Sequence, residues 1–465
     1  MKEREMFMKP NNEFLKTAPV GTLLFKLALP TIAAQLINML YNIVDRIYIG
    51  HMPGDGQLAL TGVGICMPII MVISAFAALI ASGGAPRASI FMGKGEKESA
   101  EQTMGSCFTL QILVSLLLTA ILLVWHEKLL LTFGASENTI SYATDYMRIY
   151  SIGTIFVQLT LGMNAYITAQ GFAKTSMTTV LIGALCNIIL DPIFIFGLNL
   201  GVKGAALATI VSQGISCLWV VAFLFGKKTL LRLRKDTLKI RLDLVLPCIG
   251  LGLAPFIMQS SESVISVCFN SSLLEYGGDI AVGAMTILTS VMQFAMLPLQ
   301  GLAQGAQPIT SFNYGAGNVE RVKKTFRLLL TSSLLYSISL WGCIQLFPRI
   351  FASIFTPDVA LLDFTENALR IYCGVLGLFG IQIACQMTFV ALGKAKSSIV
   401  VAVVRKFILL LPLIFILPNF FENKTMAVYF AEPVADLLAV TFTAILFYSQ
   451  FKKALKELEL QKDNV

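Results

Sequence analysis

The chain has 465 residues, of which 56% are hydrophobic and 13% are charged, and its formal net charge is +8. A soluble domain averages about 25% charged residues, so this composition excludes a soluble protein and indicates a polytopic membrane protein. The basic residues fall between apolar runs instead of forming one basic face, which argues against a nucleic-acid-binding protein.

The N-terminal residues 1–22 are charged and polar, and the first apolar run after them is long enough to cross a bilayer. We therefore expect no cleavable signal peptide. The nine cysteines are odd in number, form no CxxC motif and lie in or beside apolar runs. They are expected to pack in the core and to form neither disulfides nor a metal site.

Apolar runs of about 20 residues, the length that crosses a bilayer, predict twelve transmembrane helices. They lie near Leu23–Ile49, Leu60–Ala81, Met104–Trp125, Tyr142–Thr168, Met177–Leu198, Ala205–Phe225, Leu244–Phe269, Ala281–Ala303, Phe326–Phe347, Phe364–Leu392, Ser398–Leu417 and Ala427–Tyr448. The predicted fold class is therefore an all-α, multi-pass membrane protein with short loops between antiparallel neighbours.

The loop charges predict the orientation. With both termini inside, the inner segments hold 26 of the 35 Lys and Arg residues, the outer loops hold four, and five lie within spans. Because cytoplasmic loops carry the excess of basic residues, we expect both termini to lie in the cytoplasm. Residues 227–242 alone carry seven basic residues at the midpoint of the chain.

The two halves of the chain repeat each other at a shift of 222 residues. Matching residues include Pro86 and Pro308, Gly93 and Gly315, Arg148-Ile149-Tyr150 and Arg370-Ile371-Tyr372. Because each half has six spans, the repeat is parallel, and a cavity is expected between two lobes. The expected parts are a cytoplasmic N-terminal segment (1–22), a first lobe (23–226), a basic cytoplasmic linker (227–242), a second lobe (243–451) and a cytoplasmic tail (452–465).

Asp191 lies inside an apolar span, where a carboxylate costs about 2.5 kcal/mol or more and therefore indicates a functional site. Asn187 lies four residues earlier, on the same helical face. Pro192 follows directly and cannot donate a backbone hydrogen bond, so the helix should bend or loosen here.

Asp45, Asp191 and Thr209 are predicted to share one depth in the first lobe. Together with Asn187 they offer oxygen atoms to a hard cation such as sodium, or the two carboxylates could share a proton. Asn38 and Tyr41 lie on the face of Asp45, and these two residues are candidates for lining a cavity.

The first predicted span, which carries Asn38 and Tyr41, should kink at Pro30, below these two residues. In the second lobe Glu262 is the main acid, and Gln382 is a candidate cavity residue. Glu432 and Asp436, at the start of the last span, are expected to lie at the membrane interface.

No motif indicates an enzyme or a cofactor. The chain has no G-x-x-x-x-G-K-S/T phosphate loop, no complete H-E-x-x-H and no G-x-S-x-G. We therefore expect no catalytic residue, no cofactor and no metal beyond a possible sodium ion at the polar cluster of the first lobe.

Several stretches together resemble the multidrug and toxic compound extrusion (MATE) transporters over nearly the whole chain. They are Leu29-Pro30 with Tyr41-Asn42-Ile43-Val44-Asp45, Asn187 with Asp191-Pro192-Ile193-Phe194, Gly204-Ala205-Ala206 with Thr209, and Gln304-Gly305-Ala306-Gln307-Pro308 with Asn313-Tyr314-Gly315-Ala316-Gly317.

The resemblance implies a V of two six-helix lobes and drug efflux driven by sodium or protons. It also implies that Asp45, Asn187, Asp191 and Thr209 form the cation site and that Asn164 lines the same lobe. Glu262 matches an acid that one branch of the family has on the seventh span. The acid of that branch on the tenth span is replaced here by Ile381 or Gln382.

The leading hypothesis is a cation-coupled antiporter, driven by H+ or Na+, that exports organic and often cationic drugs across the cytoplasmic membrane by alternating access. A flippase for lipid-linked precursors is the alternative, although few basic residues lie within the spans. We expect a monomer whose partners are small organic molecules and the lipid bilayer.

The predicted topology can be tested with reporters fused at Lys235 and at Leu460. Both should report a cytoplasmic location, because the basic linker and the C-terminal tail lie on the side with most Lys and Arg residues. An external signal at either position would contradict the orientation and the parallel repeat.

Overall fold

The structure is a computed structural model that describes residues 13–53 and 56–463, and in these residues all regular structure is helical. The longer helices are α3 (Val20–Gly50), α4 (Gly56–Lys94), α5 (Lys97–Thr132), α8 (Ala173–Pro192), α9 (Val202–Phe225), α10 (Leu242–Gly315), α11 (Val319–Leu346) and α17 (Lys424–Asp463). The shorter ones are α2 (Glu13–Thr17), α6 (Ile140–Ile152), α7 (Thr154–Ala169), α12 (Pro348–Ser353), α13 (Val359–Tyr372), α14 (Phe379–Ala391), α15 (Ala395–Val403) and α16 (Leu411–Ile416).

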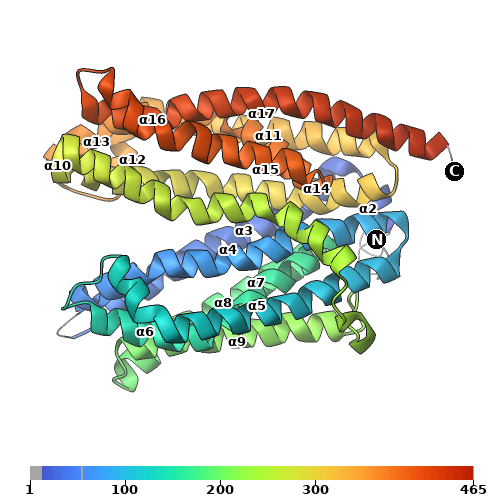
Figure 1. Cartoon of the computed structure of the whole chain (residues 1–465), viewed down its shortest axis with the longest axis horizontal. Coiled ribbons are helices and arrows are strands. Elements are labelled where there is room, and N and C mark those ends of the chain that lie inside the picture. The colour runs from blue at the N-terminus through green and yellow to red at the C-terminus, as the bar shows by residue number, and fades with distance from the viewer. Residues whose placement is uncertain (1–12, 54–55, 464–465) are drawn as a thin grey trace.

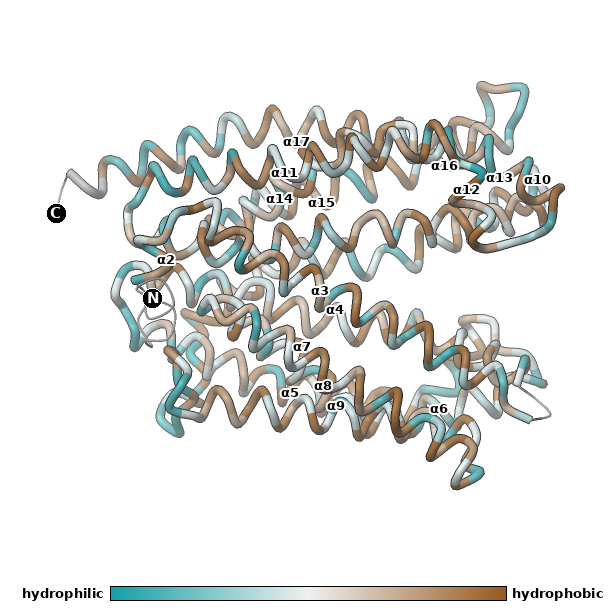
Figure 2. The backbone as a smooth tube through the Cα atoms, turned by 180° about the vertical axis from the view of Figure 1, so that it is seen from behind, coloured by the Kyte–Doolittle hydropathy of each residue, from teal (hydrophilic) through white to brown (hydrophobic). Residues whose placement is uncertain are grey.

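The described helices confirm the predicted twelve spans. Nine are long and apolar enough to cross a membrane, or eleven when each of two bent pairs counts as one span. The twelfth comes from α10, which counts once among these but contains two spans. The two spans are separated by a break at Gly278, where φ is 66°, a value that L side chains rarely adopt. Hydrophobic residues run along the helices, and hydrophilic residues gather at the two ends of the molecule (Figure 2).

The helices form two lobes, α3–α9 and α10–α17, and both described chain ends lie at one end of the molecule, here called the termini end (Figure 1). The lobes meet through α10, which packs mainly against α4 and α3. They lie together at the termini end and diverge toward the opposite end, here called the far end (Figure 1). This arrangement confirms the predicted V of two six-helix lobes.

Glycines allow the two lobes to touch through their backbones at the termini end. A Cβ atom on Gly93 would lie 2.0 Å from the carbonyl oxygen of Phe312, and one on Gly315 would lie 2.0 Å from that of Ile90. These two contacts exchange under the shift of 222 residues, so the internal repeat packs against itself. We call this contact the seam.

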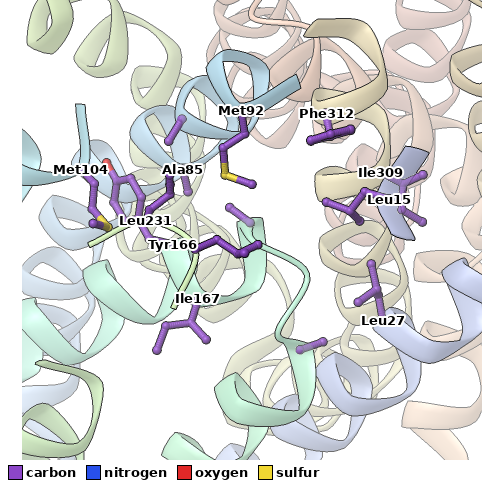
Figure 3. Close-up of a cluster of buried hydrophobic side chains, with 14 of the residues drawn as sticks. Leu15, Leu27, Ala85, Met92, Met104, Tyr166, Ile167, Leu231, Ile309 and Phe312 are labelled. Atoms are coloured by element: carbon purple, nitrogen blue, oxygen red, sulfur yellow. The ribbon is translucent and has the colours of Figure 1, made fainter. Parts of the chain in front are cut away.

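The seam continues through α3 and is buried. Thr31 Oγ1 donates to the Gly301 carbonyl oxygen at 2.6 Å, and Gln35 Nε2 donates to Gln304 Oε1 at 3.2 Å. Figure 3 shows Met92 of one lobe near Phe312 of the other, within a single buried apolar cluster. Apolar burial and backbone contact therefore close the molecule at the termini end.

The segments outside the predicted spans also pack on the termini end. In the predicted linker, the backbone amides of Leu230 and Leu231 donate to Gln170 Oε1 at 2.8 and 2.9 Å. Of the predicted segment 1–22, residues 1–12 lie outside the described residues, whereas α2 buries Leu15. Of the predicted tail, residues 464–465 are likewise outside them, and α17 continues to Asp463.

A side chain at Gly93 should open the seam. Gly93→Ala places a methyl group where backbone oxygen now lies, so α4 and α10 must separate. We expect alkylation of the native Cys248, which is buried beside Gly83 in the seam, to become several-fold faster, as followed by mass spectrometry of its peptide.

Gly250→Ala is the matched control, since nothing lies within 4 Å of a Cβ at that position. Cys66, buried in the apolar core of the far half, should react equally slowly in all variants. Unchanged protection of Cys248 in Gly93→Ala would contradict the role of the seam.

Candidate functional site

The first lobe brings two carboxylates together. Asp45 comes from α3 and Asp191 from α8, and these helices pack against each other. Asp191 is 0% exposed, and the two side chains lie within hydrogen-bonding range of each other. Asp45 Oδ1 and Asp191 Oδ2 are buried without a hydrogen-bond donor in the described structure. Two ionised carboxylates only accept hydrogen bonds, so this approach favours a shared proton or a bound cation.

Asn187 orients Asp191. Its Nδ2 donates to Asp191 Oδ1 at 3.2 Å, and its own Oδ1 is buried and unpaired. The α-helix ends at Pro192, and the π-helix η1 (Ile193–Gly197) follows directly. The predicted loosening of the helix at Pro192 is therefore observed, and π-helical turns are frequent at functional sites.

Thr209 reaches the carboxylate pair through a tyrosine. Thr209 on α9 lies within hydrogen-bonding range of the Tyr146 hydroxyl of α6, and Tyr146 is close enough to Asp45 for direct electrostatic interaction. Tyr41 interacts in the same way with Asp45 and Asp191. We did not single out Tyr146 from the sequence. The 57° bend between α6 and α7 brings it to the site, and the only signal was its position two residues before the repeated Arg148.

The other candidates of the first lobe lie apart from this pair or at its edge. Pro30 is buried in the seam, and α3 continues through it without interruption. The carbonyl oxygen of Asn38 accepts a hydrogen bond from Asn42 Nδ2 at 2.7 Å, and its side chain is half-buried. Asn164 Nδ2 donates to the Ser176 carbonyl oxygen at 3.3 Å. Ser176 lies on α8, 15 residues before Asp191, or about 22 Å along the helix, so Asn164 is far from the carboxylate pair.

The second lobe holds a cluster of charged side chains that we call the ion cluster, made of Glu262, Arg405, Lys406, Glu432 and Asp436. Arg405 donates to Asp436 Oδ1 at 2.8 Å and to Glu432 Oε1 at 3.3 Å, and Lys406 donates to Glu262 Oε1 at 2.6 Å. The expected interfacial position of Glu432 and Asp436 is wrong, because both are buried and Arg405 compensates their charge.

Gln382 also differs from an ordinary core residue. It is 1% exposed, and neither amide atom has a hydrogen-bond partner in the described structure. Its neighbour Gln386 donates to Met258 Sδ at 2.7 Å, on the helix that carries Glu262.

A cavity of about 590 Å³ lies between the lobes. Its first-lobe wall contains Arg46, Leu60, Val63, Gly64 and Met67, and its second-lobe wall contains Ser266, Asn270, Met285, Thr286 and Thr289. Apolar surface with a few convergent polar groups is typical of small-molecule sites. The carboxylate pair, the cavity and the ion cluster can thus hold a small cation and an organic molecule in separate places.

Comparison with known proteins agrees with this arrangement. A family model described as MatE matches residues 30–193 and 254–416, which fall in the two lobes. The multidrug export protein MepA of Staphylococcus haemolyticus (strain JCSC1435) is 24% identical over 442 residues, which cover 95% of each chain.

Two solved structures share the fold. A MATE protein in a bent conformation superposes with a TM-score of 0.90 at 22% identity, covering 96% of this chain and 99% of that one. An outward-facing multidrug resistance MATE family transporter of the MOP superfamily superposes with a TM-score of 0.89 at 22% identity, covering 95% and 98%.

The hydrogen bond between Asn187 and Asp191 yields a stability prediction. Asp191→Asn keeps the oxygen that accepts from Asn187 and removes a buried charge, so the thermal unfolding midpoint in detergent should stay level or rise. Asp191→Leu leaves the buried Asn187 amide unpaired and should lower the stability by about 1–3 kcal/mol.

Asp145→Asn is the control, because Asp145 is a half-exposed carboxylate of the same lobe that pairs loosely with Lys203 at 3.5 Å. It should change the midpoint little. An Asp191→Asn protein as unstable as Asp191→Leu would show that the carboxylate itself holds the fold.

Proposed function

The chain belongs to the MATE family of membrane transporters, and from that premise we propose that it is a cation-coupled antiporter that exports organic, often cationic, compounds across the cytoplasmic membrane. The observation that supports this most is the buried approach of Asp45 and Asp191. Two carboxylates with unpaired oxygens in a low-dielectric lobe favour binding of one positive charge. Asn187 and Thr209 would complete the cation site.

The seam and the cavity support alternating access. The lobes are closed at the termini end, whereas the cavity separates α3 and α4 from the second lobe. If the basic residues place the termini end in the cytoplasm, this is an outward-open state. Export then requires that the coupling ion and the organic substrate favour different states of the seam.

The coupling ion is proposed to be H+ or Na+. The close approach of two carboxylates supports a proton, since they can share one without other ligands. Sodium would instead need the neutral oxygens of Asn187 and Thr209 to complete its coordination. In both cases the ion is cargo of the transport cycle and not a resident cofactor.

The flippase alternative receives little support. The lining of the cavity contains one basic residue, Arg46 of the first lobe. In the second lobe, Arg405 and Lys406 lie deep in the spans and are paired with carboxylates. A phosphate-bearing lipid would need several unpaired basic groups along its path.

Dye efflux from vesicles with an imposed pH gradient or an imposed sodium gradient tests the proposal. We expect a pH gradient alone to drive efflux in the wild type. Asp45→Asn and Asp191→Asn should insert normally and lose transport, because neither leaves two carboxylates to share a proton. Glu262→Gln should reduce transport less.

Thr209→Val and Asn187→Leu separate the two ions. Under proton coupling, Thr209→Val should remain active, whereas under sodium coupling both variants should lose most of the ion dependence. Efflux driven by sodium without a pH gradient, and lost in Thr209→Val, would contradict the proton. Normal efflux in Asp191→Asn combined with none in Glu262→Gln would place the coupling site in the second lobe.

A further inference from the structure

The ion cluster of the second lobe carries an unbalanced charge. It combines three carboxylates with two basic side chains, so one negative charge remains when all five groups are ionised. Arg405 is fully engaged, since it binds Glu432 and Asp436 and lies over the Phe379 ring at 4.6 Å. An excess charge in a buried cluster is costly, and a further positive charge would stabilise it.

The cluster is accessible at one point. The Lys406 side chain is 4% exposed, whereas that of its partner Glu262 is 55% exposed. Glu262, Ser266 and Asn270 recur every four residues, so they lie on one face of α10. Ser266 and Asn270 line the cavity between the lobes. The exposed carboxylate therefore lies on the cavity face of α10, one turn nearer the seam than Ser266.

A second, independent feature lies level with Glu262. The first half of α10 runs from the termini end toward the far end, and α14 runs in the opposite direction. Gln386 on α14 contacts Met258 on α10. Because the two helices are antiparallel, Gln382, one turn before Gln386, lies at the level of Glu262, one turn after Met258. Gln382 is buried with both amide atoms unpaired. Gln382 is therefore level with Glu262 on the facing helix, but neither atom of its amide bonds to the carboxylate.

From this geometry we infer that Lys406 is a specificity-determining residue: its ammonium group neutralises Glu262 until the positively charged nitrogen of an organic substrate replaces it. The inference rests on the proposed export of organic cations and names the residue that selects them. Glu262 binds the substrate charge, and Lys406 competes for the same carboxylate.

The exchange leaves the cluster without excess charge. Lys406 interacts electrostatically with Glu432 as well as with Glu262, so a displaced ammonium group remains in the field of a second carboxylate. The cluster then holds three positive charges against three negative ones. A neutral molecule of the same shape cannot displace Lys406 and has no comparable gain, so the tethered ammonium discriminates by charge.

Equilibrium binding to the purified full-length protein in nanodiscs tests the inference without any ion gradient. The probes are ethidium, which is a permanent cation, and uncharged phenylphenanthridine, which has the same ring system. Lys406→Met removes the competitor, so we expect the Kd for ethidium to fall about tenfold while that for phenylphenanthridine stays constant. Glu262→Gln should raise the Kd for ethidium about tenfold and abolish the effect of Lys406→Met in the double variant.

Lys394→Met is the matched control, because Lys394 pairs with Glu457 at 2.9 Å on α17 near the termini end, away from the cavity. It should leave both Kd values unchanged. Lys406→Arg keeps the charge and holds a carboxylate more firmly, so it should weaken ethidium binding even if Lys406→Met does not fold.

Three results would overturn the inference: no ethidium binding by the wild type, equal changes for both probes in Lys406→Met, or ethidium binding by Lys406→Arg that is unchanged or tighter. Failure of the proposed function gives a different pattern. In that case ethidium binds with the expected dependence on Lys406, but neither gradient drives its efflux.

Discussion

Backbone contact between the lobes at the termini end is the constraint on which the rest of the structure depends. Where Gly93 and Gly315 meet carbonyl oxygens of the other lobe, no side chain fits, and the helices approach as closely as their backbones allow. The two six-helix bundles touch at the termini end and their helices continue to the far end. They therefore enclose a cavity at the far end. The seam therefore decides which side of the molecule is open and also places Asp45 and Glu262 on helices that border the space between the lobes.

The two lobes repeat in fold and differ in chemistry. In the first lobe the polar groups come from α3, α8 and α9, and in the second from the first half of α10, the π-helix η4 (Val404–Leu410) and α17, which are the corresponding spans. Among the described residues, the first set has two carboxylates that form no salt bridge, and the proposed cation site rests on this feature. The second set carries Arg405 and Lys406, which serve as internal cations. A duplicated scaffold thus carries one carboxylate pair without basic partners and one cluster in which two basic side chains neutralise most of the acidic charge.

Interruptions in the helices position these groups. The break at Gly153 turns α6 so that Tyr146 reaches Asp45 and Thr209, and Pro192 ends the α-helical hydrogen-bond pattern one residue after Asp191. In the second lobe Arg405 and Lys406 lie next to each other on the π-helix and bind different carboxylates. An extra residue per turn shifts the direction of the following side chains, so these local irregularities direct polar groups into otherwise apolar lobes.

The sequence by itself determined the twelve spans, the repeat and the shared depth of Asp45, Asp191 and Thr209. These features follow from the length of apolar runs and the constant rise of a helix, which are local properties. The partners of each buried charge could be seen only in the tertiary structure. Glu432 and Asp436 read as interfacial acids because nothing near them in sequence neutralises them, whereas Arg405 lies 27 and 31 residues away. Lys406 and Glu262 are separated by 144 residues, and which end of the V is closed depends on contacts between helices of different lobes. Such pairings depend on packing between distant segments, and helical periodicity carries no information about them.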